Sequence, residues 1–255
     1  MLSLLSSSST VSVTTQPSQA SYARSKWVCS FCLLVLGAHA VVKPYVSPSG
    51  SMEQTLLPGD YVLVDRVSTT GPAAELLTAG ESVRRGDVIL FRYPPDPAQV
   101  YIKRVIGIPG DRVRIVEKQV YLNGTPVDEP YAVHRDAASD SYRDFFPALP
   151  PASVTREGRA MLASHVENAE IVVPPGMYFT LGDNRDYSLD SRYWGFVPRE
   201  AVIGKPLLIY WSVAPSGEGS AGRFDPQAEL SAGSLARTRW ERILRIVGRY
   251  PLGLE

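Results

Sequence analysis

A serine and a lysine, far apart in the sequence, have the chemistry of a nucleophile and its base. Ser51 lies in the turn-like segment Pro48-Ser-Gly-Ser-Met-Glu-Gln-Thr-Leu56, and Lys103 interrupts the apolar run Tyr101-Ile-Lys-Arg-Val-Ile-Gly107. A serine hydroxyl is a weak nucleophile until a base takes its proton. A lysine can be that base only if apolar surroundings lower its pKa towards neutrality. Taken alone, the two residues indicate no more than a turn serine and a strand lysine with its ammonium group in solvent.

Histidine, the side chain that most often acts as a general base, is poorly placed in this chain. His39 lies in the most apolar stretch, and His134 and His165 fall in a region without regular pattern. A third polar segment, Gly182-Asp-Asn-Arg-Asp-Tyr-Ser-Leu-Asp-Ser-Arg192, follows a strand-like run. The lysine is therefore the better candidate for the base.

In their order and spacing, these three segments resemble the type I signal peptidases, serine–lysine peptidases of the S26-type family. Three shorter matches extend the resemblance, and they are Arg85-Gly-Asp-Val88, Pro109-Gly-Asp111 and Val197-Pro198. The resemblance covers roughly residues 43 to 212. It implies a membrane-bound serine endopeptidase that removes N-terminal signal peptides from exported preproteins after small-x-small sites. Its partners would be extended signal peptides with small P1 and P3 residues, and the lipid bilayer.

The resemblance also implies roles for the polar residues. Ser51 would be the nucleophile, and Lys103 the general base that later protonates the leaving amine. The Ser49 hydroxyl and the Ser51 backbone N–H would form the oxyanion hole. Ser188 would hydrogen-bond Lys103 and orient it.

Further residues match supporting and substrate-binding positions of that family. Asp190 and Arg192 would pair in support of the dyad, whereas Asp183 and Arg185 could serve the site or only the fold. The preprotein would lie extended beside strands near the nucleophile, as a peptide added to a sheet does. The matching substrate-binding positions are Met52, Leu56, Tyr101 and Ile102.

Two residues depart from the family pattern. Ser47 stands where an aliphatic residue is more usual, which would make the P3 pocket wider or more polar. Gln54 stands where proline is common, which leaves the backbone there less restrained. Both departures concern substrate specificity, because neither removes a catalytic group.

The elements that would position these residues are mostly short strands. Runs of β-branched and aromatic residues recur between Tyr45 and Ser212, separated by Gly, Pro and Asp, with a turn at Asn123-Gly124. This pattern predicts a mostly β fold, an antiparallel sheet or barrel-like catalytic domain over 43–212. Residues from about 132 to 170 break the rhythm with mixed polar and helical segments, so we expect an inserted α/β subregion there. The predicted strands are 61–64, 87–91, 101–106, 113–116, 119–122, 178–181 and 207–211.

The most apolar stretch, Trp27 to Val42, predicts one transmembrane anchor. As a helix it rises roughly 24 Å, and flanking Lys26 and Lys43 can reach the interfaces. A cleaved signal peptide, with Ala38-His-Ala40 as its cleavage site, and a buried helix of a soluble domain are the alternatives. Retention is favoured because an extended chain from Val42 reaches Ser51 within ~30 Å, which holds the nucleophile near the bilayer.

The position of the basic residues suggests how the chain is oriented. Arg24 and Lys26 precede the anchor, which favours a cytoplasmic N-terminus and an extracytoplasmic catalytic domain in the plasma membrane. Residues 1–26 are Ser/Thr-rich and predict a disordered cytoplasmic tail, with an organellar targeting peptide as the alternative. Residues 213–234 predict a linker. Residues 235–250 predict a basic amphipathic helix that lies on the membrane or docks on its own domain.

Composition excludes several other classes of function. The 26 basic and 26 acidic residues cancel, so whole-chain charge gives no reason to expect a nucleic-acid partner. Cys29 and Cys32 lie inside the apolar stretch, which disfavours a redox or metal site. No phosphate-binding loop or metal-ligand cluster is apparent, so no cofactor is expected. The alternatives to a signal peptidase are a self-cleaving repressor-type or conjugation-system peptidase of related β fold, and a tethered β domain that binds peptides without cutting them.

Overall fold

A computed structural model describes residues 42–66, 83–216, 224–226 and 234–252. The chain divides into two compact units, 1–40 and 41–255, and the described residues all belong to the second. The predicted tail, 1–26, and residues 27–41 of the predicted anchor lie outside the described residues, while Val42 begins the first strand. In the described part of the chain, no helix combines the length and the apolar character that crossing a bilayer requires.

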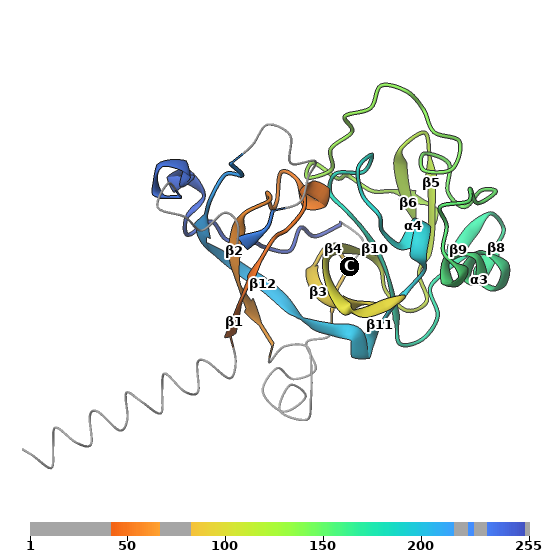
Figure 1. The fold of residues 1–255 in the computed structure, drawn as a ribbon. Coiled ribbons are helices and arrows are strands. Elements are labelled where there is room, and N and C mark those ends of the chain that lie inside the picture. Colours follow the sequence, from red (N-terminus) through yellow and green to blue (C-terminus); the bar gives the residue numbers. More distant parts are fainter. Residues whose placement is uncertain (1–41, 67–82, 217–223, 227–233, 253–255) are drawn as a thin grey trace, which may run out of the picture. The chain divides into compact units, whose positions relative to one another are not determined.

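The larger of two antiparallel sheets has seven strands in the order β1-β2-β12-β3-β4-β10-β11. Apolar side chains of its strands, among them Val62 and Ile102, form a core cluster with Met52 and Leu56 of the segment between β1 and β2. Figure 1 shows β1, β2 and β12 together, with β3, β4 and β10 beyond them. The strands are β1 (Val42–Val46), β2 (Asp60–Asp65), β3 (Val88–Tyr93), β4 (Asp96–Gly107), β10 (Met177–Leu181), β11 (Val197–Pro198) and β12 (Val202–Ser212).

The long strand β4 has different neighbours on its two flanks. β3 pairs with it from Asp96 to Arg104. On the opposite flank, β10 pairs with it from Arg104 to Gly107. The part of β4 that precedes Arg104 is therefore paired with β3 on one flank and lies beyond the end of β10 on the other.

The smaller sheet has five strands in the order β7-β6-β5-β9-β8. It shares one apolar core with β4 and β10, because Ile106, Phe179 and Leu181 cluster with side chains of β5 and β6. Figure 1 shows it on the far side of β10, beside α3. Its strands are β5 (Arg112–Val116), β6 (Gln119–Leu122), β7 (Thr125–Pro126), β8 (Val166–Glu167) and β9 (Glu170–Val172), and the helices are α3 (Arg156–His165) and α4 (Ser191–Trp194).

The prediction of a mostly β fold is confirmed, with two antiparallel sheets and few helices. Each predicted strand overlaps an observed one. The strands β2, β5 and β6 bury alternate residues, whereas β3 and β10 are buried on both faces. Asn123 and Gly124 form the predicted turn, with φ angles of 54° and 81°. The region 132–170 contains α3 and β8, as its mixed pattern suggested.

The predicted amphipathic helix over 235–250 is wrong. The structure has two short 3-10 turns there, η3 (Leu235–Arg237) and η4 (Trp240–Arg242). The following residues pair with β12, since Leu244 N–H donates to Ile209 C=O at 2.7 Å and Val247 N–H donates to Leu207 C=O at 2.8 Å. Pairing with a sheet satisfies the backbone in an extended form, which overrides the helical spacing of the apolar residues.

Part of the predicted linker, 213–234, belongs to the fold, and Val213 and Phe224 are both buried. Phe224 is buried, and its N–H donates to the Pro48 carbonyl at 2.6 Å. Its ring lies edge-on to that of Tyr61. The close approach also needs Gly59, since a Cβ there would meet the Phe224 ring at 2.9 Å and the Val213 carbonyl oxygen at 2.0 Å. This contact joins the chain after β12 to the segment that carries Ser51.

Candidate active site

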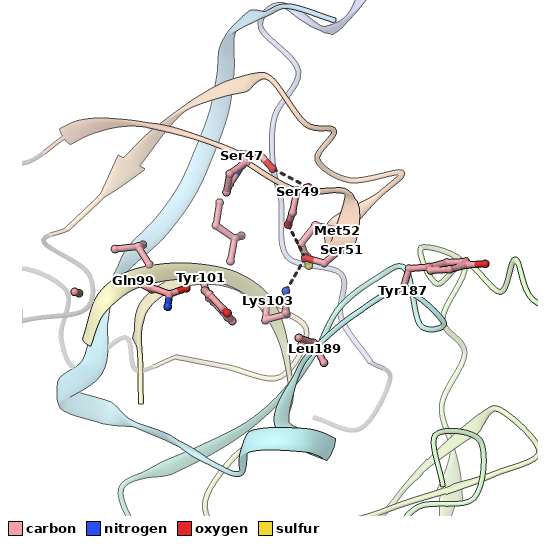
Figure 2. A pocket seen from close by; sticks show the side chains of 13 residues that line it. Ser47, Ser49, Ser51, Met52, Gln99, Tyr101, Lys103, Tyr187 and Leu189 are labelled. Atoms are coloured by element: carbon pink, nitrogen blue, oxygen red, sulfur yellow. Dashed lines mark hydrogen bonds between the residues drawn. The ribbon is translucent and has the colours of Figure 1, made fainter. Parts of the chain in front are cut away.

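Ser51 and Lys103 lie side by side in the structure. Ser51 is in the 3-10 turn η1 (Gly50–Met52), which follows β1, and Lys103 is in β4. The Lys103 Nζ donates to the Ser51 Oγ at 2.6 Å, as Figure 2 shows. A distance within hydrogen-bond range is what proton transfer from a serine to a base requires.

Burial changes the acidity of Lys103. Its side chain is 4% exposed, and desolvation lowers its pKa from 10.5 to about 8. The carboxylates of Asp190 and Asp183 oppose this shift, and the Arg192 guanidinium adds to it. With a pKa near 8, a useful fraction of the amine is neutral around pH 7 and free to accept a proton.

Ser49 lies next to the Ser51 hydroxyl. The two Oγ atoms are 3.2 Å apart and share a hydrogen bond. Ser49 is the N-cap residue of η1 in an extended conformation, which directs its side chain to the same side as that of Ser51. Ser47 is buried, and its hydroxyl donates weakly to the Ser49 carbonyl at 3.4 Å. Ser49 and Ser51 therefore present two hydroxyls at one point, with the Lys103 amine beside them.

The loop that follows β10 packs directly on the turn that carries Ser51. The Asn184 N–H donates to the Ser51 carbonyl at 3.1 Å, and the Asn184 side-chain amide donates to the Gly50 carbonyl at 3.2 Å. Gly182 makes this approach possible, because a Cβ there would lie 2.5 Å from the Ser51 carbonyl oxygen. The loop thus holds the backbone of the candidate nucleophile in place.

Asp190 and Arg192 form the pair that the sequence predicted. The Arg192 Nε and Nη2 atoms each donate to one oxygen of Asp190 at 2.8 Å, and both side chains are almost fully buried. Asp190 also accepts from the Gly182 N–H at 3.1 Å. Burial alone would raise the pKa of Asp190, but the charge and hydrogen bonds of Arg192 bring it below its usual value. The carboxylate is therefore ionised at neutral pH and favours a positive charge on nearby Lys103.

Ser188 is buried in the same loop, but the predicted hydrogen bond to Lys103 is not formed. Among contacts within the described residues, the Ser188 Oγ has no hydrogen-bond partner. The hydroxyl faces Gly182, since a Cβ at that glycine would lie 2.2 Å from it. Lys103 instead directs its amine to Ser51.

A second buried ion pair lies behind the site and was not assigned from the sequence. Arg104 donates to both oxygens of Asp183, at 2.8 and 2.7 Å, and Thr55 donates to Asp183 at 2.5 Å. The side chains of Arg104 and Asp183 are 2% and 0% exposed. Successive side chains of a strand point to opposite faces, so Arg104 faces away from Ser51 when Lys103 faces it. An arginine inside an apolar run was the only sequence signal for this pair.

A cavity of about 600 Å³ opens beside Ser51. It is lined on one side by β4 from Ala98 to Lys103 and on the other by Ser47 to Ser49. Of the predicted substrate-binding residues, Met52, Tyr101 and Ile102 line it. Leu56 does not line it, and lies fully buried in the core cluster behind Met52.

Tyr187 and Leu189 also line this cavity and were not among the residues predicted to bind substrate. Their only signal was their position in the polar segment 182–192. Within the ranges that the structure describes, no three His, Cys, Asp or Glu side chains come together as metal ligands would.

The two departures from the family pattern have structural counterparts. Ser47 is one of the residues that line the cavity. Gln54 has a φ of 76°, in the left-handed region, whereas a proline ring holds φ near −65°. The backbone at Gln54 thus has a conformation that proline could not adopt.

Known proteins that are similar to this chain belong to one family. Residues 21–211 match the family described as "Signal peptidase, peptidase S26". The chain is 36% identical to signal peptidase I of Pseudomonas fluorescens, over 77% of this chain and 74% of that protein. It is 31% identical to a probable signal peptidase I-2 of Synechocystis, over 85% and 83%. A solved signal peptidase I of Enterococcus faecalis is 34% identical and covers 48% of this chain and 94% of its own, with a TM-score of 0.36.

Proposed function

We propose that Ser51 is the nucleophile and Lys103 the general base of this chain, which belongs to the signal peptidase family, peptidase S26, and cleaves signal peptides from preproteins. The observation that carries the proposal is the 2.6 Å contact between the Ser51 hydroxyl and the buried Lys103 amine. The dyad lies at the side of a cavity large enough for several residues of an extended peptide. No other base is needed for the reaction.

In the first step, neutral Lys103 takes the proton of Ser51 while the Ser51 oxygen attacks the carbonyl carbon of the scissile peptide bond. The negative charge that develops on the carbonyl oxygen is stabilised by hydrogen bonds from the Ser49 hydroxyl and the Ser51 N–H. The protonated lysine then gives its proton to the leaving nitrogen as the peptide bond breaks. The mature chain leaves as an amine, and the signal peptide remains as an ester on Ser51.

Water completes the cycle. Lys103, neutral again, takes a proton from a water molecule that attacks the ester carbonyl, and the same two donors stabilise the second oxyanion. The ester bond then breaks, and the lysine returns the proton to the Ser51 oxygen. Each transfer needs a lysine whose two protonation states are close in free energy, which a pKa of about 8 provides.

Three residues would support the dyad without touching the substrate. Ionised Asp190, held by Arg192, favours the protonated form of Lys103, and so stabilises the state that follows proton transfer. Ser188 has a buried hydroxyl with an unused hydrogen-bonding capacity beside the loop that holds Ser51. We assign it the role of receiving a hydrogen bond from the Lys103 amine once that amine is protonated and has a third proton to donate.

The preprotein would bind as an extra strand along β4. β-strand addition gives backbone hydrogen bonds on one side and pockets for alternate side chains. Met52, Tyr101 and Ile102 would enclose the small P1 and P3 residues. Ser47 would make the P3 side more polar than an aliphatic residue does.

The anchor proposal follows from the distance along the chain. If residues 27–42 span the plasma membrane and are retained, β1 starts at the membrane surface, and Ser51 is held within ~30 Å of it. The N-terminus would be cytoplasmic and the catalytic domain extracytoplasmic. Protease treatment of sealed inverted vesicles should leave the catalytic domain intact, and its digestion there would overturn this orientation.

The dyad is tested by cleavage of a preprotein with an Ala-x-Ala site by wild type, Ser51→Ala and Lys103→Met in detergent. Both variants should lose all detectable product, since each lacks a group that the first step needs. Lys43→Met, at an exposed lysine of β1, is the matched control and should cleave as wild type does. Cleavage by Ser51→Ala at the wild-type rate would show that another group is the nucleophile.

A further inference from the structure

Two large side chains at the cavity have no part in the mechanism proposed above. Tyr187 and Leu189 are 66% and 58% exposed, and both line the cavity that contains Ser51 and Lys103. Between them, Ser188 is buried, so the loop alternates outward and inward side chains as a strand does. Figure 2 shows Gln99 and Tyr101 on one side of the dyad and Leu189 and Tyr187 on the other.

The strand pairing limits where a bound peptide can go. β3 occupies one flank of β4 from Asp96 to Arg104, so a peptide that pairs with β4 must use the opposite flank. On that flank the first β4 residue paired with β10 is Arg104, and its partner is Leu181, the last residue of β10. A peptide extended along Ala98 to Ile102 therefore meets the end of β10 at Lys103 and has to turn out of the sheet.

Because the bound peptide turns out of the sheet there, the peptide residues on one side of the scissile bond lie on the loop after β10. At Lys103 and Ser51 the peptide reaches the reacting atoms, and beyond them the loop offers Leu189 and then Tyr187. The proposed function places the small residues that precede the scissile bond against Met52, Tyr101 and Ile102. The residues that follow it, P1′ and P2′ of the mature chain, then lie over the loop.

We infer that Tyr187 and Leu189 are specificity-determining residues that bind the first side chains of the mature chain and favour apolar ones at P1′ or P2′. The inference rests on the proposed function, because the direction of the peptide does. An aromatic ring and a leucine side chain exposed together gain free energy when an apolar side chain covers them. Both belong to a loop fixed by Asp190 and Asn184, so they form a preorganised surface.

The test uses the full chain in detergent micelles and peptides with one Ala-x-Ala site. One pair of peptides carries Leu or Gly at both P1′ and P2′, and a second pair carries Ala or Val at P3. The variants are Tyr187→Ser, Leu189→Ser and their combination. Leu149→Ser is the matched control, because Leu149 is 92% exposed and does not line the cavity.

We expect the double variant to lose kcat/KM roughly five- to twentyfold on the Leu peptide and less than about twofold on the Gly peptide, the range for loss of an apolar contact. The single variants should lose less, and Leu149→Ser should match wild type on all four peptides. The ratio between the P3 peptides should be unchanged in every variant.

Three outcomes would overturn the inference. Equal loss on the Leu and Gly peptides would mean that the two residues only support the loop. A change in the P3 ratio would place the signal peptide, not the mature chain, on them. Unchanged kinetics would mean that they do not touch the substrate. All three leave the dyad intact, whereas failure of the dyad would be seen as product from Ser51→Ala, so the two hypotheses fail separately.

Discussion

The Lys103 amine reaches the Ser51 hydroxyl at 2.6 Å, although the two residues are 52 positions apart in the chain. The amine is buried, and its pKa is lowered to about 8 by desolvation. Geometry and acidity are thus produced by the same arrangement, since the strand that brings Lys103 to Ser51 also removes it from water. This coupling makes the pH dependence of cleavage a direct test of the base.

We predict that kcat/KM rises with pH and levels off above about pH 9. The base acts in its neutral form, so activity is present above the pKa of about 8 and is lost as the pH falls through it. Below about pH 7 the loss should approach tenfold per pH unit. A pH profile with a short peptide measures this, with circular dichroism at each pH as the control for folding. A flat profile between pH 6 and 9 would remove Lys103 from the role of base.

Gly182→Ala should lower kcat at least about a hundredfold, because small displacements of a nucleophile cost that much. The added methyl group would overlap the Ser51 carbonyl oxygen and the Ser188 hydroxyl, at 2.5 and 2.2 Å, so the nucleophile must move. Gly248→Ala is the matched control, since nothing lies within 4 Å of a Cβ there. Steady-state kinetics of both variants decide the matter, and wild-type kcat in Gly182→Ala would show that the loop does not position Ser51.

The strands could be predicted from sequence because they rest on local pattern, as the alternating apolar residues of β5 illustrate. The candidate dyad could not be recognised from local pattern alone, and was located through the order and spacing of three separate segments. The C-terminal segment could not be predicted in this way. Its arginines suggested a solvent-facing helix side, but Arg242 turns inward because Asp60, far away in the sequence, is buried beside it. Partners of this kind are set by tertiary contacts that no local pattern contains.

The same limit applies at the site. Arg104 adjoins Lys103, and strand geometry places the two on opposite faces, but nothing local indicates that Asp183 receives it. The Ser188 hydroxyl was predicted to bond Lys103, and it lies in the correct loop without forming that bond. Motif spacing therefore located the segments, whereas the contacts within them depended on packing.

Arg104→Met should reduce the free energy of unfolding by about 3–5 kcal/mol, because it leaves the Asp183 carboxylate buried without its cation. Arg112→Met is the matched control: Arg112 pairs with Glu167 at 2.7 Å, but these side chains are 36% and 59% exposed. An exposed pair contributes about 0–1 kcal/mol. Urea unfolding followed by fluorescence measures both. Equal effects of the two substitutions would show that Asp183 does not depend on Arg104.

Arg242→Met should destabilise the protein by about 3 kcal/mol, because Arg242 donates to both oxygens of the fully buried Asp60. The same side chain donates to the Thr55 carbonyl at 3.2 Å, and the Asp60 carbonyl accepts from the Ser47 N–H. The C-terminal segment thus holds both ends of the stretch that contains Ser51, so kcat should fall as well.

Arg245→Met, at an exposed arginine of the same segment, should stay within about 0.5 kcal/mol of wild type. Urea unfolding and steady-state kinetics measure the two effects, and an Arg242→Met variant as stable and active as Arg245→Met would show that the C-terminal segment does not support the active site.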